Sequence, residues 1–197
     1  MNLNKLEPDN FIEYLNSFIN SDSKNLLVRG YFNQDKLTAV LHLINDNENI
    51  QKVVFATGNI SEVPRLFNRS FKRGYELKNI RLNTAYTLLK SKIEFIKWER
   101  MNEWSVQTNI DLGVFYPVEG VLFSEKDTDK FLTHLSYSKA RHNILLTTND
   151  YSKRAEKLYP YVDESVILDT SQLDEQHESE MKTLTRNITE HDGEMPY

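Results

Sequence analysis

Apolar residues in the first third of the chain follow two spacings, one helical and one continuous. Phe11, Leu15 and Phe18, together with Ile12 and Ile19, fall on one face of a 3.6-residue period, which predicts an amphipathic helix. The runs 26–32 and 53–56 are short, apolar and rich in β-prone residues, which indicates buried strands, and 35–46 has helical spacing between them. This succession is a βαβ unit, which favours a parallel pair of strands with a right-handed crossover.

The middle of the chain has a weaker pattern. Pro64 is suited to begin a short helix, a longer helix is expected over 77–90, and 93–98 is expected to be extended. The apolar stretch 112–123 is interrupted by a proline and a glycine, which favours two short strands with a bend between them.

Clear periodicity returns in the last third. Thr128 is a possible N-cap for a helix, 144–146 is expected to be a buried strand, and Asp150 is placed to cap a helix over 151–159. A strand over 166–168 would complete a second βαβ unit, and the spacing of Met181, Leu184 and Ile188 predicts a final amphipathic helix.

These elements together predict an α/β fold with a mostly parallel central sheet built from βαβ units and flanked by helices, a Rossmann-like three-layer arrangement with N- and C-terminal helices. We expect residues 1–188 to form a single domain and residues 189–197 to form a polar flexible tail. The chain contains no internal repeat that would indicate another architecture.

The composition indicates the compartment and the origin of the protein. The 197 residues include no cysteine, which excludes disulfides, thiolate metal sites and a cysteine nucleophile, and is typical of a reducing compartment. No signal peptide or membrane-spanning segment is visible at the start or elsewhere, so we expect a cytoplasmic protein without membrane partners. The abundance of asparagine and lysine and the scarcity of glycine favour a bacterial or phage origin.

Charge is distributed unevenly along the chain, although the net charge is only −5. Residues 65–100 hold ten basic and three acidic residues, whereas residues 161–197 hold two basic and ten acidic residues. Such an asymmetry concerns partners rather than the fold. The acidic end is interpreted either as a solvated helix face or as a segment that meets a basic partner, including the basic segment of its own chain.

Several catalytic and cofactor motifs are missing. No P-loop, no dinucleotide-binding glycine motif and no nucleophilic serine motif occurs, and the five histidines lack metal-binding spacing. The sequence therefore indicates no cofactor, no metal site and no identifiable catalytic residue. Glu119, in an apolar stretch, is a possible acid or base, but the simpler interpretation places it on the solvent face of an edge strand.

The fold offers a first candidate site. Ligands of open α/β sheets bind beyond the carboxyl ends of parallel strands. Small polar residues follow three predicted strands there, and we take four of them as candidate ligand-binding residues: Asn59, Asn149, Asp150 and Asp169. The alternative is that these residues only cap helices and form turns.

The basic segment is the second candidate. Its cations alternate with Phe67, Phe71, Tyr75, Tyr86, Phe95 and Trp98, a combination suited to phosphate contacts and base stacking. A solvated helix whose aromatic residues face the core, or a surface for an acidic protein, would account for the same residues. The candidate nucleic-acid-binding residues are Arg65, Arg69, Lys72, Arg73, Lys78 and Arg81.

One resemblance to a known family is present. The strand LLVRGYF, the helix after it and the strand VVFATGN resemble the opening βαβ unit of phospholipase-D-like nuclease domains. The family's HxK pair is missing, because His134 is followed by Leu-Ser and His142 by Asn-Ile. The resemblance therefore implies a copy without the catalytic pair.

Two functions follow from these observations. The first is a non-enzymatic accessory or regulatory protein of a nucleic-acid-handling system, in a phage, mobile-element or defence setting, that contacts nucleic acid or a partner protein through residues 65–100. The second is a small α/β enzyme or nucleotide-binding domain, including a degenerate phospholipase-D-like domain, with its site at the strand carboxyl ends. The sequence leaves the oligomeric state open.

Overall fold

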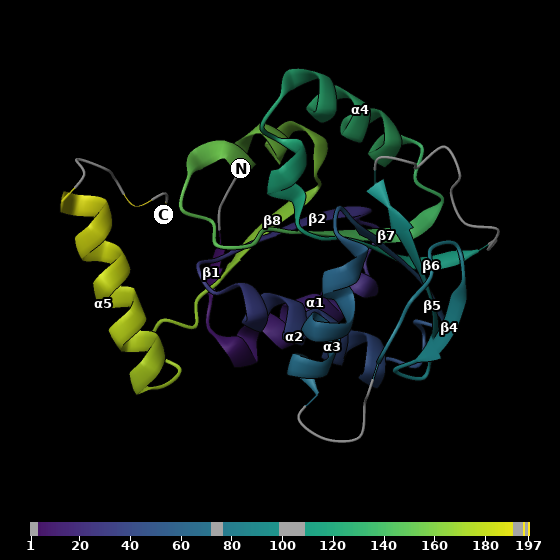
Figure 1. Cartoon of the computed structure of the whole chain (residues 1–197), viewed down its shortest axis with the longest axis horizontal. Helices are drawn as coiled ribbons and strands as arrows, with labels where there is room; N and C mark the ends of the chain where they lie inside the picture. Colours follow the sequence, from purple (N-terminus) through teal and green to yellow (C-terminus); the bar gives the residue numbers. More distant parts are fainter. Residues whose placement is uncertain (1–3, 72–76, 99–108, 191–194, 196) are drawn as a thin grey trace.

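The computed structural model describes residues 4–71, 77–98, 109–190, 195 and 197. Its strands form one sheet in the order β1-β8-β2-β7-β6-β3-β5-β4 (Figure 1). Every neighbouring pair is parallel except β4 and β5. The strands are β1 (Asn4–Leu6), β2 (Asn25–Arg29), β3 (Lys52–Thr57), β4 (Ala85–Leu88), β5 (Ser91–Lys97), β6 (Ile110–Phe115), β7 (Ala140–Leu146) and β8 (Glu164–Leu168).

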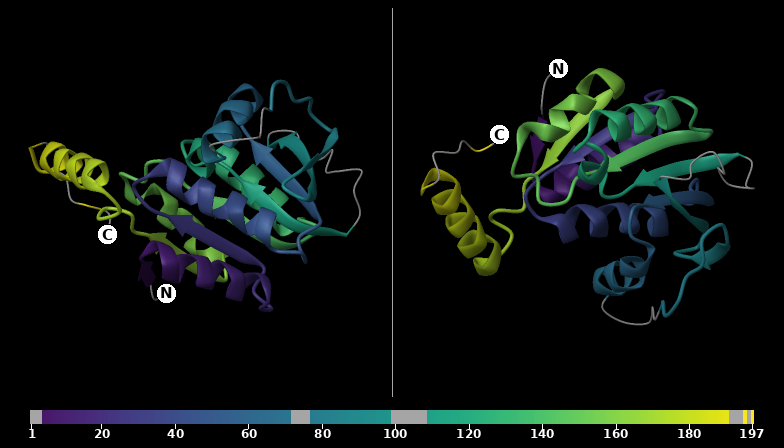
Figure 2. Two further views of the ribbon diagram at one scale, coloured as in Figure 1. Left: turned by 90° about the horizontal axis from the view of Figure 1, so that it is seen from below. Right: turned by 45° about the horizontal axis from the view of Figure 1, so that its top comes forward.

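Helices cover both faces of this sheet, so the predicted α/β class with three layers is confirmed (Figure 2). One face packs against α1 (Pro8–Ile19), α2 (Asn33–Asp46) and α3 (Val63–Ser70), through residues such as Phe11, Leu37 and Phe67. The other face packs against η3 (Val118–Val121), α4 (Glu125–Ser136) and η4 (Lys153–Tyr161), through residues such as Phe131 and Leu158. Central strands that are buried on both faces explain the continuous apolar runs in the sequence.

Two further helical segments of the described residues lie at the rims. The short η1 (Ile60–Glu62) leads from β3 into α3. The helix α5 (Glu175–Glu190) projects from the body of the molecule, and none of its residues is buried (Figures 1 and 2). Its apolar positions Met181, Leu184 and Ile188 are half-buried and share one face.

Two predicted strand pairs are not neighbours. β2 and β3 are parallel, but β7 and β6 lie between them, and β2 lies between β7 and β8. The crossover helices therefore span more than one strand. Sequence periodicity reports which residues are buried but contains no information on which strands pair, because all central strands have similar apolar runs.

Several local predictions are also corrected. The helix expected over 77–90 is replaced by the antiparallel strand β4, and the second strand expected within 112–123 is the 3-10 segment η3 after a cis Tyr116–Pro117 bond. The N-cap of α4 is Ser124 rather than Thr128. Residues 153–161 form a 3-10 segment rather than an α-helix.

The turn between β2 and α2 depends on Gly30. Its φ of +144° is in a region that residues with a side chain rarely adopt, and a Cβ there would lie 2.5 Å from the Leu168 carbonyl oxygen. We expect Gly30→Ala to lower the free energy of unfolding by about 2 kcal/mol or more, measured by urea denaturation.

Gly120→Ala is the matched control for this prediction, because nothing lies within 4 Å of a Cβ at Gly120. This control should change stability by less than about 1 kcal/mol. Equal effects of the two substitutions would contradict the proposed constraint at Gly30.

Candidate functional site

The carboxyl ends of β2 and β7 form a topological switch point. The two strands are parallel neighbours, with Val28 beside Leu146. The chain leaves β2 toward α2 on one face of the sheet and leaves β7 toward η4 on the opposite face. Because the two connections diverge, a crevice forms outside the strand ends, and this is where open α/β sheets bind their ligands.

A cavity of about 350 Å³ lies at this point. Five parts of the chain line it: the β2–α2 connection, the start of α2, α3, the β7–η4 connection and α5. The lining residues are Tyr31, Phe32, Asn33, Gln34, Asp35, Arg69, Asn149, Tyr151, Gln176, His177, Glu180 and Leu184.

An aromatic pair forms one wall of the cavity. The rings of Tyr31 and Tyr151 are stacked with centroids 6.2 Å apart and planes at 23°. Tyr31 is 5% exposed, whereas Tyr151 is 48% exposed. The two rings come from different connections, so the wall exists only because β2 and β7 are adjacent.

The opposite wall is provided by α5, which is anchored by His177. The His177 ring lies 4.6 Å from the Phe32 ring, Nε2 lies 3.1 Å from Asp35 Oδ2, and Nδ1 lies 2.7 Å from Asp174 Oδ1. Burial alone would lower the pKa of His177, but the two carboxylates outweigh it and raise that pKa. The His177 ring thus joins α5 to the first turn of α2.

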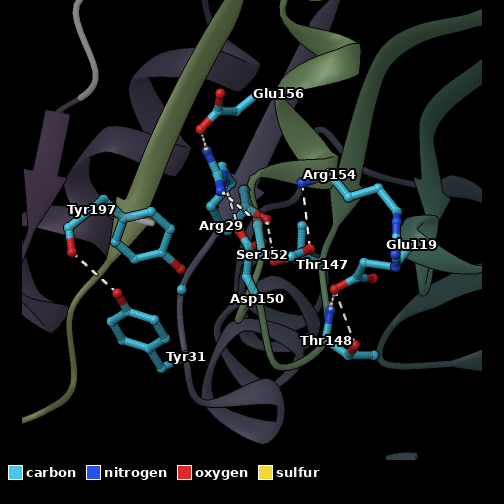
Figure 3. Close-up of polar contacts among 12 residues, drawn as sticks. Arg29, Tyr31, Glu119, Thr147, Thr148, Asp150, Ser152, Arg154, Glu156 and Tyr197 are labelled. Atoms are coloured by element: carbon cyan, nitrogen blue, oxygen red, sulfur yellow. Dashed lines mark hydrogen bonds and ion pairs between the residues drawn. The ribbon is translucent and has the colours of Figure 1, made fainter. Parts of the chain in front are cut away.

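Beneath the cavity, the Arg29 guanidinium is fully buried and paired with Asp150 (Figure 3). Arg29 Nε lies 2.5 Å from Asp150 Oδ2, Nη1 donates to the Tyr159 hydroxyl, and Nη2 donates to the Ser152 carbonyl at 3.4 Å. Glu156 is a further carboxylate, 3.8 Å from Nη1. The pair connects the end of β2 to the connection after β7.

Lys36 forms a second buried link between the same segments. Its ammonium, with no exposure, donates to the carbonyls of Thr148 at 2.6 Å, Phe32 at 3.1 Å and Gly30. Burial lowers the pKa of Lys36 to about 7. Three carbonyl oxygens accept hydrogen bonds from its ammonium group. Lys36 therefore positions the two connections rather than reacting with a ligand.

Glu119 is largely enclosed next to these groups, so the interpretation as a solvent-facing strand residue is wrong. Its Oε1 accepts from the Thr148 amide at 2.5 Å and from the Thr148 hydroxyl at 3.0 Å. Oε2 is buried without a hydrogen-bond partner within the described part of the chain. Burial raises the pKa of this carboxyl group.

The four predicted strand-end residues are separated by the strand order. Asn149 lines the switch-point cavity, and Asp150 lies below it in the ion pair instead of capping a helix, a role that Ser152 takes. Asn59 caps η1 by accepting from the Ser61 amide. Asp169 pairs with Lys5 at 3.0 Å and lines a different hollow, beside α1.

The described cations of the basic segment lie at both edges of the sheet. Arg69 is exposed and reaches the carboxyl-edge cavity, whereas Lys90 and Lys92 line a hollow at the amino ends of the strands. Arg65 is exposed and paired with Glu62 at 2.6 Å. Lys78 and Arg81 are exposed, and Lys72 and Arg73 lie outside the described residues.

The described aromatic residues of the same segment mostly serve the core, and Tyr75 lies outside the described residues. Phe67 and Phe95 are buried and contact each other and Phe55. Tyr86 is half-buried, and its hydroxyl accepts from the Arg81 amide. These rings are therefore occupied in packing and are not free to stack on bases.

Sequence reasoning missed Arg29, Tyr31 and Lys36. A signal was present, because Arg29 interrupts the apolar run 26–32 and a charged residue in a buried strand needs a partner. Lys36 had no comparable signal, because the sequence does not distinguish a buried lysine near the start of a helix from one exposed on the helix surface.

The Arg29–Asp150 pair leads to a stability prediction. Asp150→Ala leaves a fully buried guanidinium without its carboxylate, so we expect the free energy of unfolding to fall by about 3–5 kcal/mol in chemical denaturation. Lys5→Ala removes one partner of the more exposed Lys5–Asp169 pair and should cost less than about 1 kcal/mol. Similar losses in the two variants would contradict the structural role of Asp150.

Lys36 leads to a pH prediction. Since the folded-state pKa is about 7 and the ordinary value is 10.5, the unfolded chain binds more protons between these limits. Relative to Lys36→Met, the wild-type protein should therefore gain stability as pH rises from 7 to 10, on the order of 1 kcal/mol per pH unit. The check is the difference between the two unfolding free energies at each pH, and a flat difference would contradict it.

Two further findings limit the chemistry of the site. Within the described ranges, no group of three histidine or carboxylate side chains is placed to hold a metal ion. No described helix has both the length and the apolar character needed to cross a membrane. Compared with known proteins, the chain matches no protein-family model and no curated protein.

Proposed function

We propose that this protein binds a nucleotide in the switch-point cavity between the β2–α2 and β7–η4 connections. The observation that carries the proposal is the mixed lining of that cavity, in which a cation, a helix N-terminus, carboxylates and aromatic rings meet in about 350 Å³. A nucleotide has a matching set of groups: an anionic phosphate, a sugar with hydroxyl donors and a planar base.

The phosphate end is matched by Arg69 and the start of α2. Asn33, Gln34 and Asp35 form the first turn of this 14-residue helix, where the backbone N–H groups point out of the helix and attract anions. Phe32 occupies the N-cap position and has no side-chain oxygen that could satisfy these groups. Arg69 adds a positive charge from α3.

The sugar is matched by carboxylates from two helices. Asp35 is on α2 and Glu180 is on α5, and both line the cavity. Asp35 Oδ2 accepts a hydrogen bond from the Thr170 hydroxyl at 2.5 Å. His177 Nε2 contacts the same oxygen atom. An acidic residue that accepts from ribose hydroxyls is a recurrent feature of nucleotide sites in this fold class.

Binding rather than turnover is proposed, because the enclosed charged groups Lys36 and Glu119, whose pKa values are shifted, lie outside the cavity lining, and His177, which does line it, is held by two carboxylates. Lys36 donates its three hydrogen bonds to backbone carbonyls, and Glu119 accepts hydrogen bonds from Thr148. Neither residue lines the cavity. A regulatory domain that senses a nucleotide fits this arrangement.

Contact with nucleic acid, or with an acidic protein, through residues 65–100 is the second candidate function. Its support is the exposure of Arg69, Lys78 and Arg81. This role would use the outer surface, so it should depend on the charge of the whole segment and fall steeply with salt.

The test is calorimetric titration of the protein with AMP, GMP, CMP and UMP. Arg69→Ala removes the cavity cation and should weaken binding by about tenfold or more, as expected for a lost charge-assisted hydrogen bond. Arg65→Ala is the matched control, because Arg65 is on the same helix, exposed, and paired with Glu62 instead of lining the cavity. It should leave nucleotide affinity unchanged.

The outcomes separate the two candidates. If no mononucleotide binds, the proposed function is wrong. If single-stranded RNA or DNA binds in a salt-dependent manner and both arginine variants weaken it equally, the surface role of the basic segment is favoured instead.

A further inference from the structure

Tyr197 packs against Arg29 and Tyr31 (Figure 3), and we call the space that its ring occupies there the Arg29–Tyr31 recess. Its ring centroid is 4.8 Å from the guanidinium carbon of Arg29 and 4.8 Å from the Tyr31 centroid. Its backbone carbonyl oxygen accepts a hydrogen bond from the Tyr31 hydroxyl at 3.1 Å. An aromatic side chain far from β2 in the sequence is thus held at the carboxyl end of that strand.

The recess is built to receive a flat ring. Asp150, Tyr159 and Ser152 bind the nitrogen atoms of Arg29 at the edge of its guanidinium, which leaves the face of that group for stacking. A buried guanidinium face attracts aromatic rings through cation–π contact, and the interaction strengthens when water is excluded. The Arg29 side chain is fully buried, so this condition is met.

Tyr31 connects the recess to the cavity. Tyr197 is 4.8 Å from its ring, and Tyr151, a cavity residue, is stacked on it at 6.2 Å. The hydroxyl of Tyr31 lies at the recess and donates to a carbonyl oxygen. A ligand that fills the cavity with its sugar and phosphate therefore has an aromatic recess beside it.

We infer that the Arg29–Tyr31 recess is the base-binding subsite of the proposed nucleotide site and that Tyr197 is its intramolecular occupant. The base takes the position of the Tyr197 ring, and a base carbonyl oxygen replaces the Tyr197 carbonyl as acceptor for the Tyr31 hydroxyl. Guanine, uracil and cytosine present such an oxygen and adenine does not, so the preferred ligands are nucleotides whose base carries a carbonyl oxygen, for which GMP and UMP are the probes. Tyr197 competes with them and lowers their apparent affinity.

This inference rests on the proposed function and deepens it by naming the class of base. The size of the effect of Tyr197 on nucleotide affinity follows from the fraction of molecules in which the recess is free, because the apparent affinity is reduced by that fraction. If Tyr197 leaves the recess in about one molecule in ten, its removal tightens nucleotide binding by about tenfold.

The experiment compares Tyr197→Ala with the wild-type protein by calorimetric titration with GMP, UMP and ribose 5-phosphate. We expect the variant to bind GMP and UMP about tenfold more tightly and to bind ribose 5-phosphate, which has no base, with unchanged affinity. Tyr137→Ala is the matched control, because Tyr137 is 78% exposed at the end of α4. It should leave all three affinities unchanged.

A second variant tests the recess itself. Tyr31→Phe keeps the ring but removes the hydroxyl donor, so it should weaken GMP and UMP relative to AMP and leave ribose 5-phosphate binding unchanged. Circular dichroism and thermal melting establish that each variant is folded.

Each outcome has a defined meaning. If Tyr197→Ala binds GMP no more tightly than the wild-type protein does, Tyr197 does not compete with the base. The proposed function still stands in that case if Arg69→Ala weakens nucleotide binding. Failure of all three ligands to bind the wild-type protein overturns the proposed function and the inference together. Tighter binding of free L-tyrosine than of GMP to Tyr197→Ala overturns the assignment of a nucleobase.

Discussion

The buried ion pair between Arg29 and Asp150 is the interaction on which the rest of the site depends. Burying a charge costs several kcal/mol unless a partner and further hydrogen bonds compensate it. Arg29 has both, since its nitrogen atoms reach Asp150, Tyr159 and Ser152. The requirement for these partners fixes the position of the β7–η4 connection against the end of β2. Lys36 reinforces the same junction from α2 through the Thr148 carbonyl.

This junction also explains why the cavity is located at β2 and β7. The two connections leave the sheet on opposite faces, and buried side chains link the connections next to the strand ends. The buried cations hold their bases together while the outer parts of the connections diverge. Tyr31 and Tyr151 then form an aromatic wall, and the face of Arg29 becomes a stacking surface that Tyr197 uses. Structural charges and a binding surface are in this way parts of one arrangement.

Prediction from the sequence succeeded where burial alone determines the element. The predicted strands 26–32, 53–56 and 144–146 correspond to β2, which ends at Arg29, to β3 and to β7, and the spacing of Phe11, Leu15 and Phe18 belongs to α1. It failed over 77–90, where the partner of β4, rather than local propensity, makes the chain extended. The interpretation of Asp150 as a helix cap failed for a related reason, because its partner Arg29 is 121 residues away in the sequence.

The sequence by itself determined the α/β class, the location of most buried segments and the general expectation that polar residues after the strands could form a site. Only the tertiary structure decided which of those residues meet. Strand order places β2 beside β7 and separates both from β3, so Asn149 shares a cavity with Arg69 while Asn59 does not. The physical reason is that hydrophobic burial is non-directional, so it selects which segments are inside the protein. Pairing of buried charges and backbone groups is directional, and it selects their neighbours.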